Sequence, residues 1–316
     1  MEYRQESAGV GKMISTKVKP SPSAQTVRGV QIELSNEYRT LALRADETIR
    51  QITAEYPRTA RLYDLLLNDA EVNTYWNMAN YVSVVKLGYN DHGPVHAKVV
   101  TAAAMTMTHL LARHGIALDV VTSGAGDLDD ACLVVLASTM LHDIGNLIHR
   151  AGHEQAGALL AYAIYHRLLP EIYPDPELRF EVLSFILSAI ATHDCNPVPL
   201  TMEAAIVAVA DGTDMTKGRG RIAFDLGKVD IHSVSALAIE EVHIREGQQT
   251  PIDIEVIMSE SAGIFQVEQI LARKLIVTPL AAYVTLRATV KGDGPPTQRI
   301  LNTVALKDRM FRVVPS

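Results

Sequence analysis

The sequence predicts a mainly α-helical protein, in which an all-helical domain is followed by a small α+β module. From about residue 36 to residue 223, apolar residues recur every three to four positions, which is typical of amphipathic helices. Beyond Gly227 the spacing changes to the alternation that is typical of strands. The chain has 316 residues, of which 48% are hydrophobic and 21% charged, so it can bury a core without disulfides. We therefore expect a polar N-terminal arm at 1–35, a helical domain at 36–226 and an α+β module at 227–316.

The N-terminal arm is polar and contains Pro20 and Pro22, and one short strand fits Val27–Leu34. In the helical domain, capping residues and prolines indicate where helices begin, and Gly115 ends one of them. The expected helices begin near Asn36, Thr59, Asp69, Pro94 and Asp127, and later ones span His153–Leu168, Pro176–Ala191 and Thr201–Asp214.

The C-terminal module begins with two segments of alternating apolar residues, near Ile239–Ile244 and at Ile252–Met258. A helix is expected at Ala262–Leu275, followed by a strand at Ala282–Val290. This order of strand, strand, helix and strand predicts a small α+β unit. We expect this unit to serve dimerisation or regulation. If it serves dimerisation, the protein is a homo-oligomer.

Composition narrows the classes of function. The formal charge of −7 supplies no general basic field for nucleic acid or an anionic membrane. The two cysteines, Cys132 and Cys195, are far apart, which excludes a disulfide framework and fits a reducing compartment. The longest apolar run, Ala131–Leu141, is much shorter than the roughly 20 residues that span a bilayer. The first residues do not resemble a secretory signal. We therefore expect a cytoplasmic protein with no membrane partner.

The chemistry is concentrated in the helical domain, where histidines and carboxylates alternate along the chain. Imidazole and carboxylate groups together are suitable ligands for first-row divalent metals. The series consists of His92, His96, His142, Asp143, His149, His153, His193, Asp194 and Asp211. The other histidines stand alone and are interpreted as ordinary core or surface residues; they are His109, His114, His166, His232 and His243. The series predicts a metal site.

Four motifs carry a resemblance to a known family: HDIGN after an apolar helix, then HEQAGA, AIATHD and AVAD. The series resembles the HD-domain superfamily of metal-dependent phosphohydrolases, an all-helical fold, over roughly Leu87 to Arg221. It is most similar to the branch that binds two metals. The resemblance implies two divalent transition-metal ions, drawn from Mn, Fe, Zn, Co and Ni. The implied ligands of the first are His96, His142, Asp143 and Asp211; Asp143 bridges to the second, which His153 and His193 complete.

The implied reaction is phosphoester hydrolysis by a metal-activated hydroxide, with the bridging Asp143 taking part in activation. Asp194 is a candidate to orient His193 or a metal-bound water, although it can equally cap a turn. The substrate is expected to be small, phosphorylated and nucleotide-like.

A phosphate requires cationic partners, and the segment KGRGR follows the helix of Asp211. Lys217, Arg219 and Arg221 are therefore candidates for substrate binding, because arginine donates two parallel hydrogen bonds to phosphate. A solvated basic loop is the alternative. Further candidates are Arg150, Lys98, His149 and His92; the two histidines are equally compatible with an extra ligand or a structural role.

Three other functions remain open. The basic segment also resembles the HD domain of ribonuclease Y, but the negative net charge and the lack of a G-x-x-G motif make RNA cleavage an unfavoured reading. Some relatives with a similar ligand set bind two irons and activate dioxygen, so an HD-type diiron oxygenase is an alternative. A non-catalytic nucleotide sensor is the third.

Overall fold

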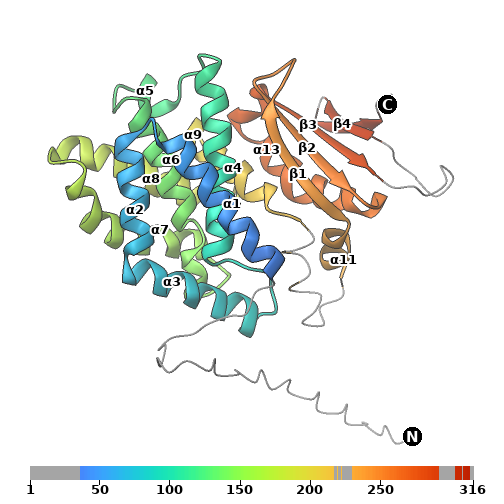
Figure 1. Ribbon diagram of the computed structural model, residues 1–316, viewed down its shortest axis with the longest axis horizontal. Helices are drawn as coiled ribbons and strands as arrows, with labels where there is room; N and C mark the ends of the chain where they lie inside the picture. Colours follow the sequence, from blue (N-terminus) through green and yellow to red (C-terminus); the bar gives the residue numbers. More distant parts are fainter. Residues whose placement is uncertain are drawn as a thin grey trace, which may run out of the picture.

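The computed structural model describes residues 36–216, 219, 222, 230–291, 303–307 and 309–313. Within these residues a helical domain precedes a small five-stranded sheet, which confirms the predicted fold class (Figure 1). The predicted strand at Val27–Leu34 and the predicted boundary near residue 226 lie outside the described residues.

The helices of the first domain agree closely with the sequence pattern, because most begin at a side-chain cap or a proline. The helix at His153–Leu168 has the predicted bounds. The helices are α1 (Asn36–Thr53), α2 (Pro57–Asn68), α3 (Ala70–Asn80), α4 (Pro94–Arg113), α5 (Asp119–Thr122), α6 (Leu128–Leu141), α7 (His153–Leu168), α8 (Pro176–Thr192) and α9 (Met202–Thr213). Short π and 3₁₀ turns lie at η1 (Tyr81–Lys86), η2 (Ile144–Leu147) and η3 (Leu169–Glu171).

Helix α6 forms the centre of this domain, and all but its first residue are buried. It contacts α2, α4, α8 and α9, which explains why it is apolar on every side. Near its C-terminal end, the carbonyl of Ala137 accepts from the Tyr165 hydroxyl at 2.6 Å, and that of Met140 accepts from the Trp76 indole at 2.9 Å. The residues that follow α6 are therefore held inside the core.

The C-terminal module consists of α11 (Ile231–Leu237) and a sheet in the order β1-β2-β3-β4-β5. The strands are β1 (Ile239–Glu246), β2 (Ile252–Met258), β3 (Val284–Val290), β4 (Thr303–Lys307) and β5 (Met310–Val313). Strands β2 and β3 are parallel and the other pairs antiparallel. A parallel pair needs a crossover, which is supplied by η4 (Ser261–Gly263), α12 (Ile264–Gln266), η5 (Val267–Ala272), α13 (Arg273–Ile276) and η6 (Pro279–Tyr283).

The sequence pattern predicted the first three strands and the crossover helix, but not α11, β4 or β5. Strands β4 and β5 are short, and β5 is largely exposed, so their apolar alternation is too weak to predict strands.

The module packs directly on the helical domain. Helix α13 and turn η5 contact α9, and β1 contacts α4, so that buried side chains of both parts form one hydrophobic core. The approach is close at Gly212 in α9, where an added Cβ would lie 3.3 Å from the Cα of Leu271. The module is thus fixed beside the end of α9, where Asp211 lies. None of the helices within the described ranges has the length and apolarity required to cross a bilayer.

Candidate metal centre

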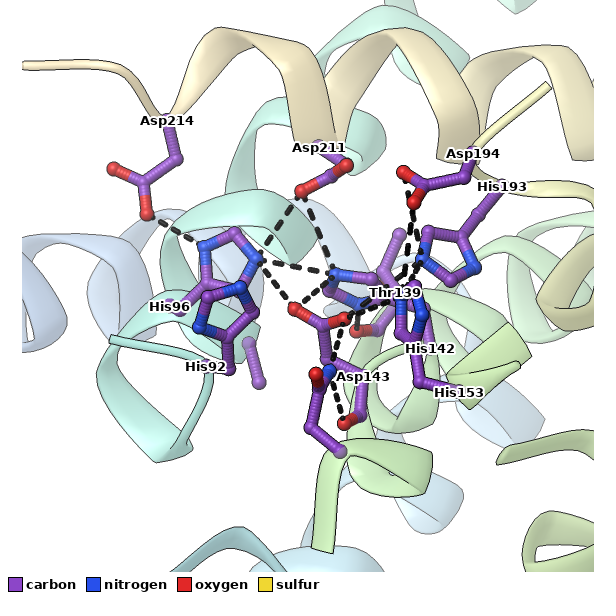
Figure 2. A network of polar contacts seen from close by, with 12 residues as sticks. His92, His96, Thr139, His142, Asp143, His153, His193, Asp194, Asp211 and Asp214 are labelled. Atoms are coloured by element: carbon purple, nitrogen blue, oxygen red, sulfur yellow. Dashed lines mark hydrogen bonds and ion pairs between the residues drawn. The ribbon is translucent and has the colours of Figure 1, made fainter. Parts of the chain in front are cut away.

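Six side chains from five parts of the helical domain converge at one buried point (Figure 2). Each lies at or near the end of a helix. They are His96 in the first turn of α4, His142 and Asp143 directly after α6, His153 at the start of α7, His193 directly after α8 and Asp211 in the last turn of α9. These are the six residues for which the sequence predicted a role in metal binding.

Local structure explains how segments distant in sequence approach so closely. In turn η2, directly after Asp143, an added Cβ on Gly145 would lie 1.9 Å from the carbonyl oxygen of His153. Only glycine allows this contact between η2 and the first turn of α7. The glycine of the HDIGN segment thereby brings His153 beside Asp143.

The first group consists of His96, His142, Asp143 and Asp211, whose ligand atoms all lie within 4.8 Å of one another. The Nε2 atom of His96 lies 3.1 Å from Nε2 of His142 and 3.2 Å from both Asp143 Oδ2 and Asp211 Oδ1. Ligand atoms about 2.1 Å from one ion are separated by about 3.0–3.4 Å at octahedral or tetrahedral angles. The spacing therefore fits four ligands of a single ion.

The second group shares Asp143 with the first. The other carboxylate oxygen of Asp143, Oδ1, lies 3.3 Å from His153 Nε2 and 3.8 Å from His193 Nε2, and these two Nε2 atoms are 3.2 Å apart. Because Oδ2 faces the first group and Oδ1 the second, Asp143 has the placement of a carboxylate that bridges two ions.

Hydrogen bonds at Nδ1 orient all four histidines in the same way. Each ring directs Nδ1 outward to an oxygen: His96 to Asp214 Oδ2 (2.7 Å), His142 to Thr139 O (2.8 Å), His153 to Arg150 O (3.0 Å) and His193 to Ile190 O (2.7 Å). When Nδ1 carries the proton of the neutral ring and donates it to this oxygen, Nε2 has a lone pair that is free to bind a metal. Two pairs of Nε2 atoms thus face each other near 3 Å, an arrangement that a shared cation stabilises.

The electrostatics of the site also favour positive charge. Burial alone would lower the pKa of His96, but hydrogen bonds to Asp143, Asp211 and Asp214 raise it to about 10. Burial likewise opposes protonation of His142, yet the Asp143 charge and its hydrogen bond raise that pKa to about 9. Burial lowers the pKa of His193 to about 4, which keeps its ring neutral. The carboxylates therefore hold protons on His96 and His142 in the metal-free site, and a divalent ion would replace these protons on binding, because a ligating imidazole must be neutral.

The remaining predicted site residues fall into three classes. Asp194 and Arg150 lie beside the second group: Asp194 Oδ2 is 3.8 Å from His153 Nε2, and Arg150 Nη2 is 3.3 Å from Asp194 Oδ2. Arg150 Nη1 also lies 2.9 Å from His153 Nε2. His92 is buried, with Nδ1 2.7 Å from the carbonyl oxygen of Asn90. These three residues line one cavity beside the metal centre.

Two predicted substrate contacts lie elsewhere. Lys98 Nζ is 3.5 Å from Asp46 Oδ1, and His149 is exposed with Nδ1 accepting from the backbone of Ala151 at 2.9 Å. Neither residue lines the cavity.

The basic segment after α9 contributes one described side chain. Arg219 is buried and lines the cavity, but it donates to the carbonyl oxygen of Asp91 at 2.8 and 3.0 Å and to that of Asp214 at 2.9 Å. It therefore stabilises the loops that hold His96, because the Asp91 carboxylate also accepts from the His96 backbone at 2.8 Å. Lys217 and Arg221 lie outside the described residues.

Two residues at the centre were not found from the sequence. Asp214 holds His96 and lies three residues after Asp211, a helical spacing that was available as a signal. Lys274 comes from α13 of the C-terminal module; its Nζ donates to Asp211 Oδ2 (2.5 Å), Asp194 Oδ1 (3.0 Å) and the carbonyl of His193 (3.1 Å). It follows Arg273 in the crossover segment, and no local pattern indicates its partners.

The cavity beside the metal centre has a volume of about 390 Å³. Asp143 and Asp211 line it together with residues of the C-terminal module, which include His232, Gln269 and Arg273. His232 was interpreted from the sequence as an ordinary core or surface residue. A ligand in this cavity contacts both parts of the chain.

Replacing Asp214 by asparagine is expected to weaken metal binding by the first group about 10- to 100-fold. The neutral amide holds the Nδ1 proton of His96 less strongly than a carboxylate and makes the ring a weaker donor. Competition with a chelator of known affinity measures the change. Asp64→Asn, at an exposed ion pair with Arg50, is the matched control. Equal affinities for the two variants would contradict a role for Asp214 in positioning His96.

One comparison with known proteins identifies a relative. The chain is 42% identical over 239 residues to the uncharacterized protein MJ1020 of Methanocaldococcus jannaschii, a match that covers 76% of this chain and 92% of that protein. No known family profile matches the chain. No solved structure matches it either.

Proposed function

We propose that this chain, which belongs to the same family as MJ1020, is an HD-type metal-dependent phosphohydrolase that cleaves a small phosphorylated substrate. The observation that carries the proposal is the placement of Asp143 between two groups of histidines whose Nε2 atoms all face inward. Such a bridging carboxylate is the arrangement expected of a site for two divalent ions.

The residues present fit two divalent transition-metal ions. His96, His142, Asp143 and Asp211 would hold one; Asp143, His153 and His193 would hold the other, and Asp194 is close enough to add a further oxygen. When bound, such ions supply a hydroxide at neutral pH and neutralise the charge of a phosphoryl group. The histidine and carboxylate donors are compatible with Mn, Fe, Co, Ni and Zn.

The protein contributes orientation and charge to this reaction. The backbone carbonyls and Asp214 hold each imidazole in one tautomer, so that its donor atom needs no rearrangement on binding. The guanidinium of Arg150 lies 3.8 Å from Asp143 Oδ1, where it can donate to an oxygen of a phosphoryl group at the centre. Asp194 accepts from both Arg150 and Lys274 and thereby orients both cations.

The size and charge of the site support a small substrate. A volume of about 390 Å³ lies within the range of small-molecule pockets, roughly 300–1,000 Å³. A nucleotide or another small phosphoester fits this space. The net charge of −7 supports neither RNA nor DNA as the substrate.

The test is the metal content per chain, measured by elemental mass spectrometry on protein purified without chelator, with hydrolysis assayed in parallel for Mn, Co and Zn. We expect about two ions per chain and metal-dependent release of phosphate from phosphomonoesters or phosphodiesters. Two irons with a mixed-valent paramagnetic signal and no phosphate release would instead support the diiron oxygenase. Tight nucleotide binding without turnover under every metal would support the sensor.

Location and assembly remain proposals as well. We propose a cytoplasmic location, supported by the two free cysteines, Cys132 and Cys195. We also propose a homo-oligomer formed through the C-terminal module, whose sheet has β1 and β5 at its edges. Light scattering of the purified chain gives the oligomeric state directly.

A further inference from the structure

We propose that Arg273 binds a second anionic group of the substrate, so that the C-terminal module selects small phosphoesters that carry two separate anionic groups. The inference rests on the proposed function, because it assigns the attacked phosphoryl group to the metal centre. It extends that function by naming a specificity residue in the part of the cavity lining that the C-terminal module supplies, where the sequence indicated only a dimerisation or regulatory module.

The wall that carries Arg273 is fixed relative to the metal centre. Its neighbour Lys274 is buried and donates to Asp194, Asp211 and the carbonyl of His193. About two turns earlier, the amide of Gln266 donates to His232 O at 2.7 Å and to Ser235 Oγ at 3.0 Å, which ties the crossover segment to α11. A residue on this segment therefore has a defined position with respect to the metal ligands.

Arg273 itself is exposed and lines the cavity. It forms no hydrogen bond or ion pair with another residue in the part of the chain that the structure describes. It also borders a second hollow of about 510 Å³, whose lining includes Ile276, Leu306 and Phe311. Arg273 and Gln269 line both hollows, so the two hollows adjoin at these residues.

The other described cations that line the cavity are already engaged. Lys274 is paired with two carboxylates, Arg150 lies between Asp143 and Asp194, and Arg219 donates to backbone carbonyls. Among these four cations, only Arg273 donates to no other residue in the described part of the chain. A planar guanidinium with open donors binds carboxylate or phosphate through two parallel hydrogen bonds.

Two anion sites follow from this distribution of charge. Arg150 is paired with Asp143 and Asp194, but it lies beside the metal ligands, where a remaining N–H can donate to the group that is attacked. Arg273 belongs to the C-terminal module and is not among the metal ligands, so it serves a group that is not attacked. The ligand chemistry shared by all such substrates is a phosphoryl group linked through a short spacer to a carboxylate or a second phosphate.

Non-hydrolysable probes test the inference independently of catalysis. Calorimetry of the metal-loaded full chain gives dissociation constants for methylphosphonate and for phosphonoacetate, 3-phosphonopropionate and 4-phosphonobutyrate, which add a carboxylate at increasing distance. We expect at least one carboxylated probe to bind about 10- to 100-fold more tightly than methylphosphonate. Arg273→Met should remove this gain without altering the affinity for methylphosphonate or the metal content, and Arg273→Lys should retain part of it.

The control is Arg61→Met, which removes an exposed arginine paired with Glu171 on the helical domain and should leave every affinity unchanged. The inference is overturned if the wild-type chain binds all four probes equally, or if Arg273→Met weakens methylphosphonate as much as the carboxylated probes. Failure of the proposed function gives a different result: no phosphate release with any metal, while the dependence of probe binding on Arg273 persists.

Discussion

Replacing Asp143 by asparagine is expected to abolish the binding of two metals and to lower phosphoester hydrolysis by about 100-fold or more. Asp143 directs Oδ2 toward His96 and His142 and Oδ1 toward His153 and His193. An amide offers one oxygen and one NH₂ group, so it cannot serve both groups of ligands. Elemental mass spectrometry and a phosphate-release assay on the same preparations measure the two effects.

Asp64→Asn is the matched control, because it makes the same chemical change at an exposed position on α2. Asparagine is nearly isosteric with aspartate, so Asp143→Asn is expected to remain folded by circular dichroism. If that variant retained two ions per chain and near-normal turnover, the bridging role of Asp143 would be wrong. If the variant retained one ion, the remaining site would be the group of ligands that the single oxygen of the asparagine can still serve.

Replacing Lys274 by methionine is expected to destabilise the metal-free protein by about 3–5 kcal/mol, because it leaves buried carboxylates without their cation. The Nζ atom of Lys274 lies between Asp194 and Asp211, and although burial opposes protonation, the charges of Asp211 and Asp194 raise the pKa of Lys274 above its usual value. Metal ions should restore part of the lost stability, since they neutralise Asp211. Urea unfolding with and without Mn²⁺ measures the free energy of unfolding in both states.

The control for this variant is Lys98→Met, which removes a lysine that is also paired with an aspartate but is more exposed and lies away from the cavity. Its effect should be at most about 1 kcal/mol, as for ordinary exposed ion pairs. Equal stabilities of Lys274→Met and the wild-type chain, in both the presence and the absence of metal, would refute the structural role of Lys274.

Most of the helical domain could be predicted because its signals are local. The proline that begins α4, the Asp127 cap of α6 and the apolar period of α7 each depend on residues within one or two turns. The short strands β4 and β5 could not be predicted, because they are held by pairing with β3 and with each other rather than by a strong pattern of their own.

The histidines and aspartates that the structure brings together could also be selected from the sequence, because their ordered series resembles that of the HD-domain superfamily. Of the residues that the sequence suggested for substrate binding, Arg150, His92 and Arg219 line the cavity, whereas Lys98 and His149 do not. Lys98 and His149 lie near predicted ligands in the sequence, yet their side chains leave the helix and the turn on other faces. Arg219 is drawn inward by the carbonyls of Asp91 and Asp214, which no spacing in the KGRGR segment indicates.

The sequence by itself determined the fold class, the positions of most helices and the set of imidazole and carboxylate groups available to a metal. These properties follow from periodicity and residue chemistry, which are readable along the chain. Only the tertiary structure decided that Asp214 holds His96 across 118 residues and that Lys274 reaches Asp211 across 63. Such contacts depend on how α9 and α13 pack, and packing is set by the shape of the whole core rather than by any local pattern.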